Sequence, residues 1–116
     1  MVKNLQEFAN VWVASWNSHD LEAILSHYTD DIEMTSPYMV QVVGVGTLQG
    51  KEKLREYWRL GLERNPKLEF RVVDVAIGVD MVSIYYYSVT MQKHVIESFW
   101  FNENGLVFKC NSAYCA

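Results

Sequence analysis

Apolar residues recur at intervals of three and four in three parts of the chain, a spacing that predicts amphipathic helices. The first helix is expected from Lys3 to Trp16, the second follows the NSHD break, and the third lies between Gly50 and Pro66. Their apolar stripes are Leu5, Phe8, Trp12 and Trp16, then Leu21, Ile24, Leu25 and Tyr28, then Leu54, Tyr57, Trp58 and Leu62.

The second half of the chain is rich in β-branched and aromatic residues, which predicts strands. Four strands are expected, at residues 68–78, 81–92, 94–102 and 106–115. Their connections are short enough for hairpins, so they should form an antiparallel meander. A short strand before them carries Ile32, Met34 and Ser36 on one face and stops at Pro37. Residues 38–50 resist assignment, because their valines favour an extended chain while their glycines favour bends.

Helices grouped before the meander indicate an α+β fold. Both faces of the meander are apolar: Tyr85 and Tyr87 mark one face of its second strand, and Val82, Ile84 and Tyr86 mark the other. Tyr85 and Tyr87 are taken as the inward pair. Three helices can cover only one face of the sheet, so the outer face is expected to form a homodimer with a second copy of the chain.

The composition limits the classes of function. A length of 116 residues suits one domain, 1–116, and the net charge of −4 argues against nucleic-acid binding. No apolar run approaches the roughly 18 residues of a membrane helix, and the N-terminus lacks a signal-peptide pattern. Cys110 and Cys115 have opposite strand parity, which disfavours a disulfide between them. A soluble protein of the cytoplasm is the simplest expectation.

One carboxylate lies in an apolar strand. In HVIESFWFN, Glu97 shares its face with Val95, Phe99 and Phe101. A carboxylate on the core side must be protonated or hydrogen-bonded, since an unpaired buried charge is costly. Three interpretations therefore stay open for Glu97: a structural acid bonded to a tyrosine or tryptophan, a ligand anchor, or a catalytic acid.

Many aromatic side chains have inward-looking periodicity and would either fill the core or line a pocket. A pocket of this kind would suit a small, apolar, carbonyl-bearing molecule. Its expected lining is Trp12, Trp16, Tyr28, Met34, Ser36, Trp58, Tyr85, Tyr87, Phe99 and Tyr114. The spacing of the histidines gives no metal site, and no glycine-rich phosphate loop is present, so no cofactor is expected.

Three stretches together resemble a known family. They are WVASWNSHDLEAILSHYTDDIEMTSP, GKEKLREYWR and the late ESFWFNENG. From about residue 4 to residue 114, the chain is similar to the nuclear transport factor 2-like superfamily, in its SnoaL-like and ketosteroid-isomerase-like branch. The resemblance implies a cone-shaped α+β barrel of the cystatin-like kind, in which a strongly curved, mostly antiparallel sheet wraps three N-terminal helices around a pocket.

The ketosteroid isomerase pattern can be carried over at three positions. Its hydroxyl donor falls on Trp12, its proton-shuttling aspartate on Ser36, and its oxyanion-hole acid on Glu97. A serine without an activating base cannot shuttle a proton at neutral pH, so steroid isomerisation is disfavoured. If the domain is an enzyme, the resemblance implies cofactor-independent acid–base chemistry of an isomerase, cyclase or dehydratase type, with Glu97 as acid or anchor and with Trp12 and one tyrosine polarising an oxygen. The alternative is a non-catalytic dimerisation or ligand-sensing module.

Overall fold

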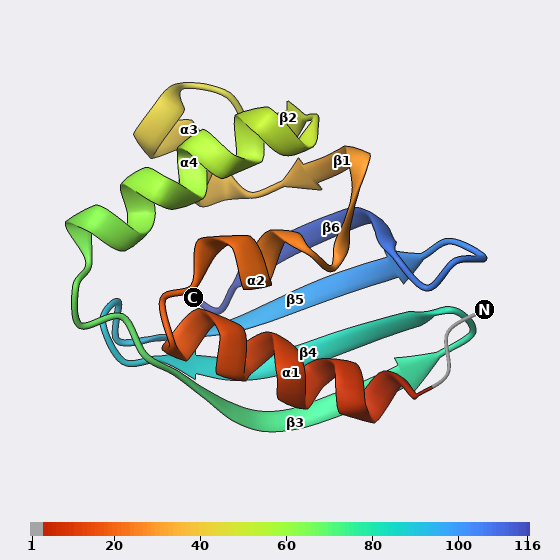
Figure 1. Ribbon diagram of the computed structural model, residues 1–116. Coiled ribbons are helices and arrows are strands. Elements are labelled where there is room, and N and C mark those ends of the chain that lie inside the picture. The colour runs from red at the N-terminus through yellow and green to blue at the C-terminus, as the bar shows by residue number, and fades with distance from the viewer. Residues whose placement is uncertain (1–3) are drawn as a thin grey trace.

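Four helices and six strands follow one another in residues 4–116, the part of the chain that the computed structural model describes (Figure 1). They are α1 (Leu5–Asn17), α2 (Leu21–Leu25), β1 (Tyr28–Thr35), α3 (Pro37–Val43), β2 (Thr47–Gln49), α4 (Lys51–Arg64), β3 (Phe70–Gly78), β4 (Met81–Ser88), β5 (Lys93–Phe101) and β6 (Val107–Tyr114). The predicted α+β class and the four-strand meander are confirmed. The predicted helix start at Lys3 lies outside the described residues.

The six strands form one sheet in the order β2-β1-β6-β5-β4-β3. All neighbouring strands are antiparallel except β1 and β6, which run parallel. The sheet is strongly curved, and the helices lie against its concave side (Figure 1). It does not close into a barrel, because β2 and β3 remain as edges. The space between the concave sheet and the helices is where the core and the cavity lie.

Helix α1 places the aromatic stripe of the N-terminal region against the sheet. Its first turn is capped by Asn4, whose side chain accepts a hydrogen bond from the Glu7 backbone N–H at 3.0 Å. Trp12 is buried and stacks on Phe70 of β3, with the ring centroids 5.8 Å apart. The predicted amphipathic helix is thereby confirmed, and its apolar face forms one wall of the interior.

Two short segments differ from their predicted structure. Helix α2 ends at Leu25, so Tyr28 begins β1 instead of continuing the helical stripe. The unassigned region contains helix α3, with Ser36 as N-cap and Pro37 in the first turn. The helix ends at Gly44, whose φ of 83° suits a residue without Cβ. These capping signals outweigh the extended preference of the valines.

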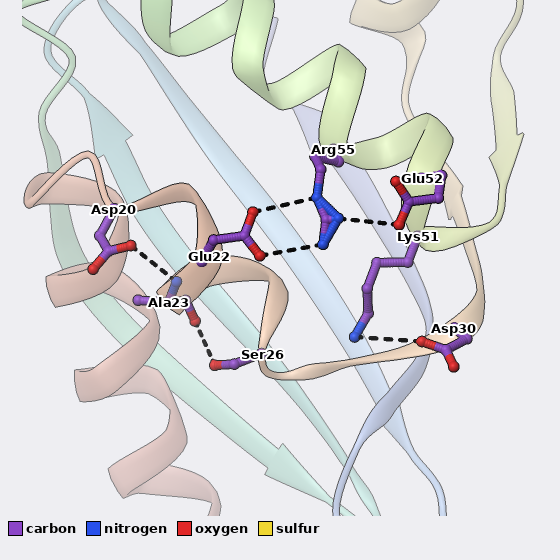
Figure 2. A network of polar contacts seen from close by, with 8 residues as sticks. All are labelled: Asp20, Glu22, Ala23, Ser26, Asp30, Lys51, Glu52 and Arg55. Atoms are coloured by element: carbon purple, nitrogen blue, oxygen red, sulfur yellow. Dashed lines mark hydrogen bonds and ion pairs between the residues drawn. The ribbon is translucent and has the colours of Figure 1, made fainter.

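Ion pairs hold the outer face of α4 to its neighbours (Figure 2). Arg55 makes two hydrogen bonds to Glu22 of α2, both at 3.2 Å, and one to Glu52 at 3.1 Å. Lys51 lies 3.7 Å from Asp30 of β1. Two of these pairs connect α4 to other elements, and the pair of Arg55 with Glu52 lies within the helix.

The two faces of β4 are the reverse of those predicted. Val82, Ile84 and Tyr86 are buried on the concave face, whereas Tyr85 and Tyr87 lie on the convex face, half-buried beside neighbouring strands. Strand register fixes this assignment, since Ile84 pairs with Glu97 on β5. The inward placement expected for Tyr85 and Tyr87 is therefore wrong, because both faces are apolar and the alternation alone does not identify the inner one.

Candidate functional site

A cavity of about 220 Å³ lies between the concave sheet and helices α1, α3 and α4. Its walls are mostly aromatic and aliphatic, with a few polar groups. It is lined by Trp12, Trp16, Met34, Tyr38, Val42, Tyr57, Trp58, Leu60, Gly61, Arg64, Asn65, Leu68, Phe70, Tyr86, Ser88, Thr90, Met91, Glu97, Ser112 and Tyr114. A 150 Å³ apolar cavity in another protein holds a benzene molecule. The space here is therefore suited to roughly one substituted ring.

Glu97 lies in the cavity wall, where β5 passes between β4 and β6. Its side chain is 4% exposed, and its Oε1 accepts a hydrogen bond from the Tyr86 hydroxyl at 3.0 Å. Ser112, its cross-strand partner on β6, supplies a second hydrogen bond to the carboxyl group. The predicted inward orientation of Glu97 is confirmed. Hydrogen bonds from two hydroxyl groups accommodate its carboxyl group in the interior.

Burial dominates the acidity of Glu97. Desolvation raises its pKa to about 7, although the hydrogen bonds from Ser112 and Tyr86 favour the ionised form. Near neutral pH the group is consequently present in both protonation states. The protonated form donates a hydrogen bond and the ionised form accepts a proton, so a single residue at this position has both abilities.

The indole N–H of Trp12 is already engaged. It donates to the Tyr28 hydroxyl at 3.2 Å, and both side chains are only 1% exposed. Trp12 still contributes to the cavity wall, but its N–H reaches a ligand oxygen only if this internal hydrogen bond breaks. Tyr28 and Phe99 are core residues behind the wall and do not line the cavity.

Ser36 has a structural task at the position where the resemblance implied a base. Its Oγ accepts a hydrogen bond from the Tyr38 backbone N–H at 3.2 Å and thus caps α3. It also bonds to the Tyr114 side chain, an interaction that opposes the effect of burial on the Tyr114 pKa, which reaches about 12. Ser36 is buried and does not line the cavity.

Comparison with known proteins shows the family to which the chain belongs. The family model of the SnoaL-like domain matches residues 9–109, which is most of the chain. The chain belongs to the SnoaL-like family. No curated protein matches it significantly.

Solved structures support the same assignment. A SnoaL-like protein of unknown function from Burkholderia thailandensis shares 41% identity with this SnoaL-like domain, over 96% of this chain and 93% of that one, with a TM-score of 0.92. A candidate isomerase of the SnoaL-like family from Agrobacterium tumefaciens is 11% identical, covers 96% and 97%, and has a TM-score of 0.76. AclR, a candidate hydroxylase from Streptomyces galilaeus, is 19% identical, covers 95% and 87%, and has a TM-score of 0.75. The last two similarities concern the fold alone.

The structure of this SnoaL-like domain brings several expected residues to the cavity. Those that line it are Trp12, Trp16, Met34, Trp58, Glu97 and Tyr114. Those that do not are Tyr28, Ser36, Tyr85, Tyr87 and Phe99. Of the buried polar atoms in the described residues that have no hydrogen-bond partner, one is the indole N–H of Trp16, in a side chain of the cavity wall.

Sequence reasoning missed three tyrosines of the cavity as functional candidates. Tyr86 is the hydrogen-bond donor to Glu97, and Tyr38 and Tyr57 join Tyr114 on the side of α3 and α4. Burial and the proximity of Tyr114, Tyr38 and Glu97 raise the pKa of Tyr57, so its phenol stays protonated. The helical stripe did contain Tyr57, but Tyr38 lay in the unassigned segment.

Neither a metal site nor a membrane segment is found in the part of the chain that the structure describes. Within residues 4–116, no group of three or more His, Cys, Asp or Glu side chains is arranged to hold a metal ion. None of the helices there has the length and apolar character that a membrane crossing requires. Cys110 is buried and both cysteines are free thiols, and burial raises the pKa of Cys110.

Proposed function

We propose that this SnoaL-like domain binds a small, mostly apolar, carbonyl-bearing molecule in its cavity, with Glu97 as the group that recognises the oxygen. The observation that carries the proposal is the buried carboxyl group in the wall of a cavity otherwise lined mainly by aromatic rings. Protonated Glu97 would donate to a carbonyl oxygen, and the Tyr86 hydroxyl holds the carboxyl group in place. The aromatic walls would contribute apolar contact area.

The enzymatic form of the proposal is cofactor-independent acid–base chemistry on that carbonyl compound. A pKa of about 7 suits Glu97 for both donating and accepting a proton near neutral pH. Ionised Glu97 would take a proton from the carbon next to the carbonyl and leave an enolate, and the protonated Glu97 so formed would return that proton to a different carbon of a conjugated substrate, which would isomerise it. Glu97 is the one carboxyl group that lines the cavity, so it would have to perform both transfers.

A second candidate function is ligand binding without chemistry. The role of Ser36 favours this second function. Its hydroxyl caps α3 and is also hydrogen-bonded to the Tyr114 side chain, so no general base is present at that position. In this case Glu97 would serve as an anchor in a ligand-sensing or dimerisation module. The two candidates differ in whether protons exchange on the bound molecule.

Acetophenone in deuterated buffer at pH 7 separates these candidates. Binding is followed by chemical-shift changes, and catalysis is followed by loss of the methyl proton signal as deuterium replaces it. For the enzyme we expect both effects, and Glu97→Gln should abolish the exchange; for the anchor we expect binding only, weakened by Glu97→Gln. The matched control is Glu103→Gln, which changes the same charge in an exposed turn. Binding that is unchanged by Glu97→Gln would refute the role of Glu97.

We also propose that the convex face of the sheet forms a homodimer, as the sequence led us to expect. The ring of His94 lies between those of Tyr85 and Tyr87, with centroid distances of 5.3 Å and 4.9 Å. Ile96 on the same face is 40% exposed, and Trp100 packs under the Lys109 ammonium group, 5.5 Å from its ring. Aromatic rings in such a half-exposed cluster are typical of interface cores.

Light scattering at micromolar concentration tests the dimer. A mass near twice 13.5 kDa is expected for the wild type, and Ile96→Glu should reduce it to that of the monomer. Val11→Glu is the control, because Val11 is 43% exposed but lies on α1, away from this face. A monomeric wild type would refute the dimer.

We also propose that the protein is located in the cytoplasm. Its two free thiols agree with a reducing compartment.

A further inference from the structure

The cavity has one charged residue of each sign in its lining. Among its twenty lining residues, Glu97 is the only acid and Arg64 is the only base. Glu97 is buried, whereas Arg64 and Thr90 are the exposed members of the lining. The cavity therefore opens beside Arg64 and Thr90, between the end of α4 and the turn that joins β4 to β5, both on the left in Figure 1.

Arg64 differs from the other arginines of the chain. Arg55, Arg59 and Arg71 each form an ion pair with a glutamate. No ion pair joins Arg64 to any acidic group in residues 4–116. Arg64, an exposed residue of the cavity lining, is thus available for an anion, and the planar donors of a guanidinium group match a carboxylate.

The position of Arg64 at the end of α4 has a structural explanation as well. A cation in the last turn of a helix interacts favourably with the helix dipole. The Gly61 carbonyl in that turn is already satisfied by Asn65, through its backbone N–H at 3.1 Å and its side-chain Nδ2 at 2.8 Å. A purely structural role would therefore affect stability but would not distinguish charged from neutral ligands.

The two charges also fix the orientation of a bound anionic ligand in the cavity. Glu97 is partly ionised near neutral pH and repels an anion at its end of the cavity, while Arg64 attracts an anion at the mouth. At roughly 3.3 Å per residue, about 13 Å of strand separates Glu97 from Lys93, where β5 leaves the turn at the mouth. The anionic group and the oxygen near Glu97 must then lie at opposite ends of the ligand.

We propose that the ligand is a monocyclic carboxylic acid that enters with its carboxylate at Arg64 and presents a hydroxyl or carbonyl oxygen to Glu97. This inference rests on the proposed function and names the ligand class for the same cavity. The volume of about 220 Å³ sets the size to one ring with a short side chain. Arg64 is accordingly a specificity-determining residue and takes no part in proton transfer.

Three probes that share one ring test the charge preference: para-hydroxyphenylacetate, the neutral alcohol tyrosol and the cation tyramine. Titration calorimetry at pH 7 and low salt should give the tightest binding for the acid, then tyrosol, then tyramine. An exposed ion pair contributes up to about a fivefold gain in affinity, so Arg64→Gln should weaken acid binding about fivefold and leave tyrosol binding unchanged. High salt should remove the same advantage.

The matched control is Lys67→Gln, which removes one positive charge three positions away, outside the cavity lining. It should leave the binding of all three probes unchanged. Three outcomes would overturn the inference while the proposed cavity function stands. In the first, both variants lose the same affinity for the acid. In the second, Arg64→Gln loses the same affinity for the acid and for tyrosol, and in the third, tyramine binds more tightly than the acid. If the wild type binds acetophenone but none of the three probes, the inference fails and the proposed function stands; if it binds neither acetophenone nor any of the three, both fail.

Discussion

Replacing Glu97 by glutamine should make the domain more stable at alkaline pH, which is an unusual consequence for a buried, hydrogen-bonded residue. Glutamine has nearly the same shape and its carbonyl oxygen still accepts the hydrogen bond that Tyr86 donates at 3.0 Å. The substitution therefore removes the ionisation and preserves most of the packing. Any change in stability that depends on pH then reports the cost of the buried charge.

The magnitude follows from the acidity of Glu97. Its pKa rises from an ordinary 4.5 to about 7 in the folded chain, mainly because it is buried. Between these values the folded chain retains a proton that the unfolded chain releases, so the unfolding free energy falls as pH rises. The stabilising contribution is complete below pH 4.5 and is lost as pH passes 7. At about 1.4 kcal/mol per pH unit, the total loss is about 3 kcal/mol.

Thermal unfolding followed by circular dichroism measures this effect. Wild type and Glu97→Gln should unfold at similar temperatures at pH 5, and the variant should be more stable by about 10 °C at pH 8. Glu103→Gln, in the exposed turn between β5 and β6, should follow the wild type at both pH values. If the melting temperatures of wild type and Glu97→Gln change in parallel with pH, Glu97 is not held in its protonated form by burial and the reasoning is refuted.

Three further substitutions test the scaffold by urea denaturation. Tyr28→Phe should lower the unfolding free energy by about 1–3 kcal/mol, because the buried Trp12 N–H loses its acceptor; a neutral result would contradict this. Arg55→Gln should cost at most about 1 kcal/mol, and less in high salt, because its pair with Glu22 is largely solvated; a salt-independent loss would argue otherwise. Gly44→Ala should cost about 1 kcal/mol because of its φ of 83°, and an unaltered stability would show that the turn adapts.

The elements predicted correctly from the sequence are those with long, regular periodicity. The stripe containing Trp12 and Trp16 is visible in the sequence because its spacing matches one helix face, and the meander is visible because short turns separate apolar runs. Helix α3 was missed because its valines have a strand preference. Its boundary signals, Ser36-Pro37 at the start and Gly44 at the end, were nevertheless present in the sequence.

The site was predicted in part, for a different physical reason. Glu97 was placed inward correctly, because it shares its strand face with Val95, Phe99 and Phe101 and matches the late-strand acid of the resemblance. Tyr86 was not identified, because neighbouring side chains on β4 are aromatic on both faces and alternation gives no preferred side. The register between β4 and β5 decides the matter, and register is a property of the folded sheet.

The acid and its hydroxyl donor belong to a single hairpin. Tyr86 and Glu97 lie on β4 and β5, eleven positions apart in sequence, whereas the opposite walls of the cavity come from α1, α3 and α4. This hydrogen-bonded pair therefore forms from contacts that are local in the sequence. Substitutions on the helices would reshape the space around that pair and alter which molecule fits, without breaking the hydrogen bond between Tyr86 and Glu97. The hairpin and the helices can therefore vary independently: the hairpin sets the hydrogen bond of the buried acid, and the helices set the shape of the space beside it.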